Sequence, residues 1–280
     1  MVTGRNCMEE SNSTKNNTLK LSIQVRLNGL SFCILETATN KIEFYKRVSF
    51  EKDHNPVKVL REIEKIYDEE KALAQSFEEV SVLFSNELYS TVPREFFVEE
   101  EASNLLKFNT KILQTDVVEH DSINEEMANV YIPYTNITNY LFDKYGEFEF
   151  KHTATILIQE LLELSAFEET SVYLNNYNEY YDLVIIRNKK LVFCNTFNYD
   201  TPQDLIYYLL FTAEQLHLDP LELKLILLGD IDKDSAEYKI MYTYINSIEF
   251  LEPRFKLENE YAKKDFQRKE FLLLKQLGCE

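Results

Sequence analysis

Three aspartates at alternate positions, Asp230, Asp232 and Asp234, are the residues whose spacing comes nearest to a metal site. An EF-hand calcium loop that begins this way also needs Gly at its sixth position and Glu at its twelfth. Those positions hold Ser235 and Met241. We therefore interpret Asp234 or Ser235 as the N-cap of a following helix, because both residue types accept hydrogen bonds from the first helical N–H groups. The sequence predicts no metal site.

Cysteine and histidine supply the other groups that could do chemistry. Cys33 and Cys194 lie inside apolar segments, Cys7 and Cys279 lie near the chain ends, and no C-x-x-C pair occurs. We expect four free thiols in a reducing compartment. No nucleophile elbow, phosphate-binding Walker loop or dinucleotide fingerprint occurs either, so we predict no catalytic residue. Four widely separated histidines form no ligand pattern and are expected to be structural: His54, His120, His152 and His217.

The charge balance limits the partners of the chain. Its 280 residues carry 48 acids and 30 bases, a net charge of −18. Such a field repels phosphate backbones and anionic lipids, so we predict neither nucleic-acid nor membrane binding. The polar N-terminal segment lacks the apolar core of a signal peptide. No apolar run approaches the ~20 residues of a membrane span. We expect a cytoplasmic protein.

The elements that must position any site occur twice along the chain. Each time, three strands are followed by a helix and a further apolar strand, and both helices begin with an N-cap residue and Pro, as Asn55-Pro56 and Thr201-Pro202. The dipeptide Asn28-Gly29 predicts a hairpin turn between the first two strands. The first series reads LKLSIQVRL, SFCILE, KIEFYKRVSF, HNPVKVLREIEKIY and EVSVLF; the second reads SVYLNNY, YDLVIIR, KLVFCNTF, DTPQDLIYYLLFTAEQL and LKLILLG. This duplication predicts an α/β (α+β) fold with mixed sheets.

The remaining segments complete a division into two lobes and two tails. We expect residues 1–18 to be a disordered tail, because they are polar and lack periodicity. The predicted lobes cover 19–150 and 151–253, and the charged segment 254–280 is predicted to form a helix on or beside the second lobe. Further helices are predicted at 94–108, 136–145, 154–165 and 236–246, and short strands at 129–133, 148–150 and 247–251.

Three segments resemble a family of bacterial proteins of unknown function. They are VYIPYTNITNYLFDKYGEFEFKH at 130–152, LVFCNTFNYDTPQDLIYYLLFTAEQL at 191–216 and LSIQVRLNGLSFCIL at 21–35. The resemblance spans about 19–251. It implies an actin-like ATPase fold made of two ribonuclease-H-like lobes, and it implies no reaction. A fold of this kind holds nucleotide and Mg²⁺ between its lobes, with a phosphate loop at the first hairpin of each lobe.

The loops that would hold nucleotide lack much of the chemistry that phosphate and Mg²⁺ require. The first hairpin offers Asn28, Gly29 and Ser31 without any acid, and the second offers Asn175 and Asn176 without any glycine. Phosphate binding needs close backbone N–H groups, and Mg²⁺ needs carboxylates. We therefore predict a degenerate cleft that binds no cofactor.

Two other features bear on function. The adenosine loop expected after the last strand of the second series has only one glycine, in Gly229-Asp230. The first strands of both series lack the carboxylate that a ribonuclease-H-like nuclease needs for its metal pair.

Our leading hypothesis is a non-catalytic interaction or scaffold protein. The alternative is an ATP-binding switch or weak ATPase, which predicts acids converging between Asn28 and Asn175. A sensor of another small ligand is a third possibility.

Tyrosines supply the interface candidates. Tyr177, Tyr180 and Tyr181 surround the second hairpin, and Tyr207 and Tyr208 lie on the helix after Pro202. That helix is apolar nearly all round, which indicates either burial between two layers, the simpler interpretation, or a contact face. Because tyrosine is enriched at protein interfaces, we expect any partner to be another protein.

Overall fold

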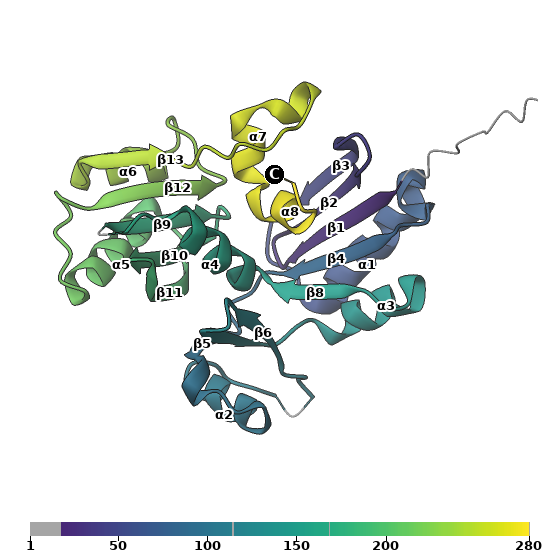
Figure 1. The fold of residues 1–280 in the computed structure, drawn as a ribbon, viewed down its shortest axis with the longest axis horizontal. Coiled ribbons are helices and arrows are strands. Elements are labelled where there is room, and N and C mark those ends of the chain that lie inside the picture. Colours follow the sequence, from purple (N-terminus) through teal and green to yellow (C-terminus); the bar gives the residue numbers. More distant parts are fainter. Residues whose placement is uncertain (1–17, 114, 168, 280) are drawn as a thin grey trace, which may run out of the picture.

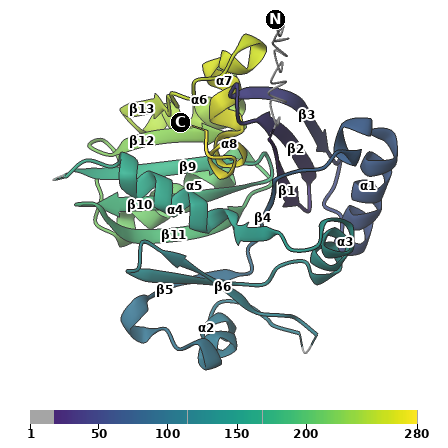
Figure 2. The ribbon, with the colours of Figure 1, turned by 45° about the vertical axis from the view of Figure 1, so that its right-hand side comes forward.

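The computed structural model describes residues 18–113, 115–167 and 169–279. These residues form two five-stranded sheets and a smaller three-stranded sheet. The two large sheets lie side by side, with α4 (Thr153–Leu164) and α8 (Phe271–Gln276) between them, as Figures 1 and 2 show. The predicted fold, two lobes with mixed sheets, is confirmed. The predicted tail up to residue 17 lies outside the described residues.

The first lobe is built on a mixed sheet in the order β3-β2-β1-β4-β8. The meander β1–β2–β3 is antiparallel, whereas β4 and β8 run parallel to β1. Its elements are β1 (Leu19–Arg26), β2 (Gly29–Glu36), β3 (Lys41–Ser49), α1 (Pro56–Glu69), β4 (Glu79–Phe84), α3 (Thr135–Tyr145) and β8 (Glu149–His152). The boundary drawn after residue 150 falls inside β8, whose His152 still pairs with Phe84.

The second lobe repeats this sheet in the order β11-β10-β9-β12-β13, with the same strand directions. Its elements are β9 (Thr170–Asn176), β10 (Tyr180–Arg187), β11 (Lys190–Asn198), α5 (Pro202–Gln215), β12 (Lys224–Gly229), α6 (Ala236–Tyr244) and β13 (Ser247–Phe250). Each sheet has a register shift at the same place, between Ile34 and Leu35 in β2 and between Ile185 and Ile186 in β10. The shared irregularity shows that the second lobe copies the first in backbone detail.

Alternating apolar residues explain how the layers assemble. Leu21, Ile23 and Val25 of β1 are fully buried in a cluster with residues of α1 and α3, on the outer face of the first sheet. A matching cluster joins the second sheet to α5 and α6. The inner faces of both sheets share a third cluster with α4 and α8, to which Leu83 and Leu228 contribute. Because one apolar cluster serves both lobes, their inner faces are buried together.

The helix starts follow the predicted capping. The Asn55 side chain accepts a hydrogen bond from the Lys58 backbone N–H at 2.9 Å, and Thr201 forms a capping box with Asp204. Ser235 caps α6, as predicted for one of the two candidate residues. Pro56 and Pro202 occupy first helical positions, where the missing N–H group costs nothing.

A small sheet is inserted between β4 and α3. It has the order β5-β7-β6, packs beneath α4, and carries the short helix α2 (Figure 1). Its elements are β5 (Tyr89–Pro93), α2 (Ala102–Lys107), β6 (Glu119–Ile123) and β7 (Met127–Tyr131). The single helix predicted at 94–108 is wrong: Phe97 and Val98 are extended, and they separate two 3-10 turns, Arg94–Phe96 and Glu99–Glu101.

The C-terminal segment lies between the lobes rather than only beside the second one. It forms a 3-10 turn (Asn259–Ala262), α7 (Lys264–Lys269) and α8, where one helix was expected. The break lies at Glu270, whose backbone (φ −105°, ψ 24°) leaves the helical region. α7 contacts β12 of the second lobe, whereas α8 contacts β1 and β2 of the first. This segment therefore bridges the two sheets.

Candidate functional site

The first hairpin, β1–β2, forms one wall of the cleft between the lobes. β1 ends at Arg26 and β2 begins at Gly29, so the turn residues are Leu27 and Asn28. The expected turn at Asn28-Gly29 is thus displaced by one residue. Gly29 pairs with Arg26, and a Cβ atom at Gly29 would lie 2.6 Å from the Val48 carbonyl oxygen. Glycine is needed here for the close approach of β3, not for a left-handed turn.

The second hairpin, β9–β10, touches the first directly. The Asn28 side-chain amide donates to the Tyr177 carbonyl oxygen at 3.0 Å. The Arg26 guanidinium lies over the Tyr177 ring, 5.6 Å from its centroid, and Tyr177 stacks on Tyr180 at 4.7 Å. Arg26 is buried, and its Nε atom has no hydrogen-bond partner in the described part of the chain. A cation–π contact thus joins the two hairpins where phosphate groups would need to lie.

Little space remains between the hairpins. A cavity of about 90 Å³ is bordered by Arg26, Asn28 and Arg47 of the first lobe and by Tyr177 and Glu179 of the second. Pockets that bind drug-sized ligands typically measure about 300–1,000 Å³. In this arrangement of the lobes, the cavity between the hairpins is too small for a nucleoside triphosphate.

The asparagine side chains proposed for the phosphate loops make hydrogen bonds within the protein. The Asn175 amide donates to the Tyr177 hydroxyl at 2.6 Å. The Asn176 amide donates to the Asp230 carbonyl oxygen at 2.6 Å, and its oxygen accepts from the Tyr199 hydroxyl at 2.8 Å. Ser31 is fully buried. Asn175 and Asn176 hold the second hairpin against its neighbours, whereas the Ser31 hydroxyl of the first hairpin has no hydrogen-bond partner among the described residues.

The loop after β12 is closed by two guanidinium groups. Gly229 has a φ of +71°, and a Cβ atom there would lie 2.2 Å from the Asn176 carbonyl oxygen, so only glycine fits. The Gly229 carbonyl oxygen accepts from Arg268 of α7 at 2.8 Å. Arg47 of β3 binds the Asp230 carboxylate through both terminal nitrogens, with Nη1 2.9 Å from Oδ1. Residues from three separate segments therefore meet at this loop.

Glu270 extends this contact into a network. Its buried carboxylate accepts from Arg47 at 3.0 Å and from the Tyr45 hydroxyl at 2.6 Å. Burial and the Glu270 carboxylate raise the pKa of Tyr45 far above its usual value, so the hydroxyl keeps its proton and remains a donor. Arg47 and Tyr45 belong to the first lobe, Asp230 to the second, and Glu270 to the bridging segment. We call these four residues the Arg47 network.

Acids do lie near the cleft, as the ATP-switch alternative requires: Glu179 lies beside Asn28 and Asp53, whereas Asp182 and Asp230 are engaged within the protein. Asp182 of β10 is buried beside Tyr177 and accepts a hydrogen bond from Thr196 at 2.7 Å. Burial raises the pKa of Asp182 to about 6. Asp230 is paired with Arg47. Neither carboxylate faces open space between Asn28 and Asn175.

The tyrosine candidates divide into two groups. Tyr177, Tyr180 and Tyr181 are buried, so the expectation that they add to a surface patch is corrected: they pack between the hairpins and under α5. Tyr207 and Tyr208 of α5 are exposed, contrary to the burial that we considered the simpler interpretation. The reason is that α5 covers only the outer face of its sheet, and none of the described residues forms a further layer over it.

Sequence reasoning missed the charged residues that close the cleft, namely Arg26, Arg47, Arg268 and Glu270. Arg26 stands at a strand position between Val25 and Leu27, and such a charge among apolar neighbours is the signal that could have drawn attention to this group. Buried charges are rarely found without partners, so they indicate long-range pairing.

The other chemically capable residues have structural roles. His152 is buried; its Nδ1 atom accepts from the Ala154 backbone N–H, and burial lowers its pKa to about 3, so the ring is neutral. Asp232 pairs with Arg268 and Lys269. Within the described ranges, no three His, Cys, Asp or Glu side chains are grouped as metal ligands.

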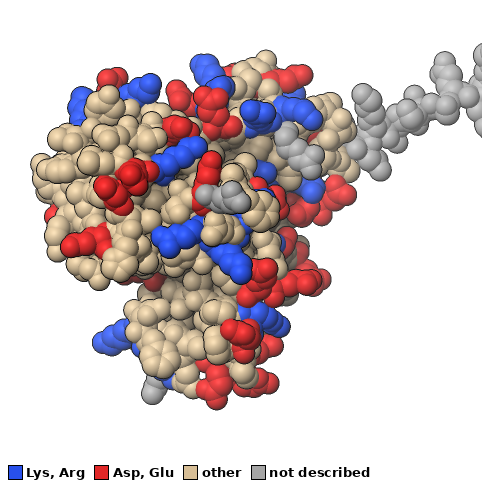
Figure 3. Space-filling view, turned by 60° about the vertical axis from the view of Figure 1, so that its left-hand side comes forward, with Lys and Arg blue, Asp and Glu red and all other residues tan. Residues whose placement is uncertain are grey.

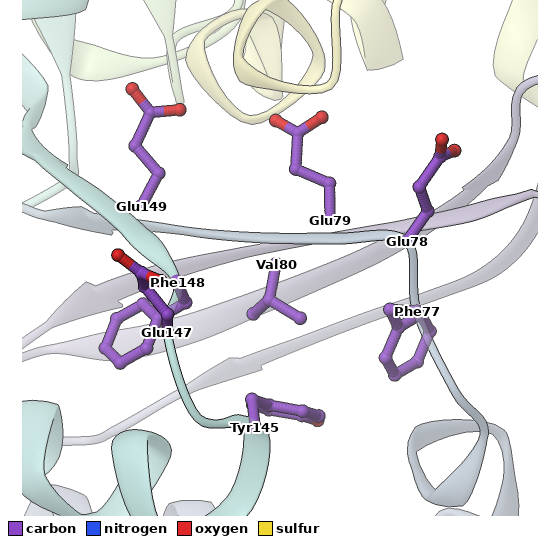
Figure 4. Close-up of a pocket in the computed structure, with 8 residues that line it drawn as sticks. All are labelled: Phe77, Glu78, Glu79, Val80, Tyr145, Glu147, Phe148 and Glu149. Carbon is purple, nitrogen blue, oxygen red and sulfur yellow. The ribbon is translucent and has the colours of Figure 1, made fainter.

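A depression at the edge of the first sheet is rich in acids. Figure 4 shows Glu78, Glu79 and Glu149 on one side of β4 and Val80 on the other. Glu79 pairs with Lys20 at 2.6 Å, and Glu149 pairs with Lys151 at 2.7 Å. We interpret this depression as a solvated rim.

The surface is of mixed charge on the face shown in Figure 3, where lysines and arginines occur singly or in small groups among the acids. Among the helices of residues 18–113, 115–167 and 169–279, none is both long and apolar enough to cross a lipid bilayer.

Comparisons with solved structures place the fold. A Bacteroides thetaiotaomicron VPI-5482 protein with an actin-like ATPase fold and unknown function superposes with a TM-score of 0.79 at 20% identity, covering 96% of this chain and 99% of that one. The PilM–PilN type IV pilus biogenesis complex gives a TM-score of 0.56 at 12% identity, covering 92% of this chain and 96% of that one. Comparison with curated proteins yields no match.

The family comparison covers most of the chain. The sequence pattern described as "Protein of unknown function (DUF3822)" matches residues 9–248, which include both duplicated sheets except for the last strand residues. The predicted resemblance is confirmed: this chain is a member of the DUF3822 family and has the actin-like ATPase fold.

Proposed function

We propose that this chain is a non-catalytic interaction module of the bacterial cytoplasm, whose partner is another protein and which needs no nucleotide. The observation that carries the proposal is the direct contact of the two hairpins, with Arg26 over Tyr177 and a cavity of only about 90 Å³ beside them. The Arg47 network supplies the cross-lobe attraction that a bound nucleotide and Mg²⁺ would otherwise supply.

The outer face of α5 is the proposed contact surface. Tyr207 and Phe211 are exposed and stack on each other with centroids 6.1 Å apart, while Tyr208 stacks on Phe197 at 5.4 Å. We call Tyr207, Tyr208 and Phe211 the α5 aromatic face. Rigid aromatic side chains lose little conformational entropy on binding and are common interface anchors.

Two further observations support a protein partner. A chain of the PilM–PilN type IV pilus biogenesis complex resembles this chain in fold and belongs to a protein complex. The net charge of −18 favours a partner segment with basic residues around an apolar anchor. The free thiols of Cys33, Cys194 and Cys279 suit a reducing cytoplasm.

Calorimetric titration with Mg-ATP and Mg-ADP tests the nucleotide-independent part of the proposal. We expect no saturable heat up to millimolar nucleotide, because binding would have to displace Tyr177 from Arg26 and break the Arg47 network. Micromolar binding of either nucleotide would overturn the non-catalytic assignment and favour the ATP-binding switch.

The contact surface is tested by cross-linking in the native host, followed by purification of the tagged chain. The double variant Tyr207→Ser/Phe211→Ser is expected to lose a cross-linked partner that wild type retains. Phe142→Ser is the matched control, because Phe142 is about as exposed as Tyr207 but lies on α3 of the first lobe. Retention of the partner by the α5 variant would exclude this face as the contact.

A further inference from the structure

A second and larger cavity lies between the lobes. Its volume is about 260 Å³, and both lobes contribute to its wall. We call it the lobe 1 pocket, since most of its lining belongs to the first lobe. Its wall includes Leu27, Asp53, Glu87, Leu88 and Tyr134 of the first lobe and Tyr180 of the second.

The lobe 1 pocket adjoins the first-lobe counterpart of the Gly229-Asp230 loop. Val25 of β1 pairs with Phe84 as Asn176 of β9 pairs with Gly229, so Ser85 corresponds to Asp230. Arg47 and Arg268 donate hydrogen bonds to the Gly229-Asp230 loop, whereas the hydrogen-bond partner of the Ser85 side chain among the described residues is the Tyr180 hydroxyl, at 3.2 Å. Among the described residues, no guanidinium group lines the pocket.

The lining of the lobe 1 pocket is mainly apolar, with acids at its mouth. Asp53 and Glu87, both solvent-exposed, are the charged residues among its described lining residues, which include no lysine or arginine. Within the described part of the chain, neither acid forms an ion pair, although Glu87 accepts a hydrogen bond from Asn198. Glu179 lies next to Asp53, and burial together with the Asp53 charge raises its pKa. The mouth of the pocket is therefore negative.

One polar group in the wall has no partner. The Tyr134 hydroxyl is buried beside Asn86 without forming a hydrogen bond of acceptable geometry in the described structure. A buried hydroxyl without a partner carries a desolvation cost. A polar atom of a ligand that reached this hydroxyl would remove that cost.

We propose that the lobe 1 pocket binds a small organic cation, an amine with an apolar body. The body would lie against Leu27, Leu88 and the ring of Tyr134, and the ammonium group would lie at the mouth near Asp53 and Glu87. Phosphorylated and carboxylate ligands are disfavoured there, because the same acids repel them. The proposal does not rest on the proposed function, since a protein that binds a partner through α5 can bind an amine here or not.

Such a ligand would act on the arrangement of the lobes. Tyr180 belongs to the second lobe, whereas Asp53 and Leu88 belong to the first, so an occupied pocket touches both. A ligand that binds only the closed arrangement stabilises it in proportion to its occupancy. The amine would therefore reinforce the contact that the Arg47 network makes on the other side of the hairpins.

Three probes of similar shape test the proposal: phenethylamine, 2-phenylethanol and 3-phenylpropionate, each titrated into the full chain by calorimetry and amide chemical-shift mapping. We expect phenethylamine to bind about five- to tenfold more tightly than the neutral alcohol, as two surface ion pairs would provide, and the carboxylate not to bind. Shifted amides should include those of Leu88 and Tyr180. Equal affinity for all three probes, or no binding at millimolar concentration, would overturn the proposal.

Variants of the lining residues test separately how the acids and the cavity volume contribute to phenethylamine affinity. Asp53→Asn/Glu87→Gln should lower phenethylamine affinity to that of the alcohol and leave the alcohol unchanged. Leu88→Trp, which fills the cavity, should abolish binding of both. Glu78→Gln/Glu147→Gln, at the acidic depression of Figure 4, is the matched control and should change neither affinity. Unaltered phenethylamine binding in the Leu88 variant would refute the site.

Discussion

The loop after β4 in the first lobe and the loop after β12 in the second have equivalent backbone positions. Their side-chain surroundings differ. In the second lobe, Asp230 is bound by Arg47, and the preceding Gly229 carbonyl accepts from Arg268. In the first lobe, Ser85 meets one tyrosine hydroxyl and borders a pocket of about 260 Å³. The duplicated backbone thus determines which loops border the cleft. A few charged side chains determine whether the cleft is filled or contains a pocket at each loop.

The difference also assigns separate tasks to the two halves of the cleft. The closed half holds the lobes together through buried charges, and the open half has an apolar wall that faces solvent through an acidic mouth. Each substitution below changes one half of the cleft, and the unchanged half serves as the reference.

The largest effect is expected from Arg47→Met. Glu270 is buried, and Arg47 is its ion-pair partner among the described residues, so the variant leaves a buried carboxylate without a cation. Removing one partner of a buried pair costs about 3–5 kcal/mol. We expect the free energy of unfolding, measured by urea denaturation, to fall by that order.

Lys46→Met is the control on the neighbouring residue of β3. Lys46 pairs with Glu70 at 2.7 Å on the partly exposed surface of the first lobe. Exposed pairs contribute about 1 kcal/mol or less. If both variants lost the same free energy, the Arg47 network would contribute no more than a surface ion pair, and the closed half would need another explanation.

A second variant tests the closed loop by shape rather than charge. Gly229→Ala must accept a φ of +71° and a Cβ atom 2.2 Å from the Asn176 carbonyl oxygen. We expect a loss of about 2–4 kcal/mol, from left-handed strain and overpacking together. Thermal unfolding followed by circular dichroism measures this loss.

Gly146→Ala separates these two contributions. Gly146 has a similar φ of +76°, but nothing lies within 4 Å of its added Cβ atom. Only backbone strain of about 1–3 kcal/mol applies there, because the ψ of −134° also lies outside the left-handed helical region. Equal losses for the two alanine variants would mean that Asn176 and its hairpin move aside freely, which contradicts a tightly closed loop.

Much of the fold was predictable because its signals are local. Strand alternation, the Asn55 and Thr201 caps and the repeated order of elements require no knowledge of distant contacts. The strands β5 and β6 were not predicted, because EHDSI and YSTVP are polar or Pro-terminated and are held in place by pairing with β7. The break in the C-terminal helix likewise depends on where Glu270 binds.

The site was predictable in position and not in content. The weak phosphate-loop chemistry at Asn28 and Asn175 drew attention to two hairpins that are in contact in the structure. However, Arg47 and Asp230 are 183 residues apart, and no local pattern relates them. The burial of Tyr177 and the exposure of Tyr207 also depend on which layer covers each element, which a hydrophobic pattern alone does not specify.

The smallest expected change in the free energy of unfolding concerns Asp182, which occupies the position in the second hairpin that Ser31 occupies in the first. Asp182 pairs with Asn175 across the second hairpin as Ser31 pairs with Gln24 across the first. Burial raises the pKa of Asp182 from 3.8 to about 6. The folded chain therefore binds this proton more tightly than the unfolded chain, so the stabilisation is complete below about pH 4 and is lost as the pH rises through about 6.

Asp182→Asn cannot titrate, so the free-energy difference between wild type and this variant should shift with pH. From about pH 5 to pH 7.5, wild type should lose about 1 kcal/mol relative to the variant. Thr196→Val sharpens the test: the hydrogen bond from Thr196 lowers the pKa of Asp182, so its removal should move the transition to higher pH. A difference between wild type and Asp182→Asn that stays constant over this range would show that Asp182 is hydrated, and that the second hairpin is less closed than its contacts indicate.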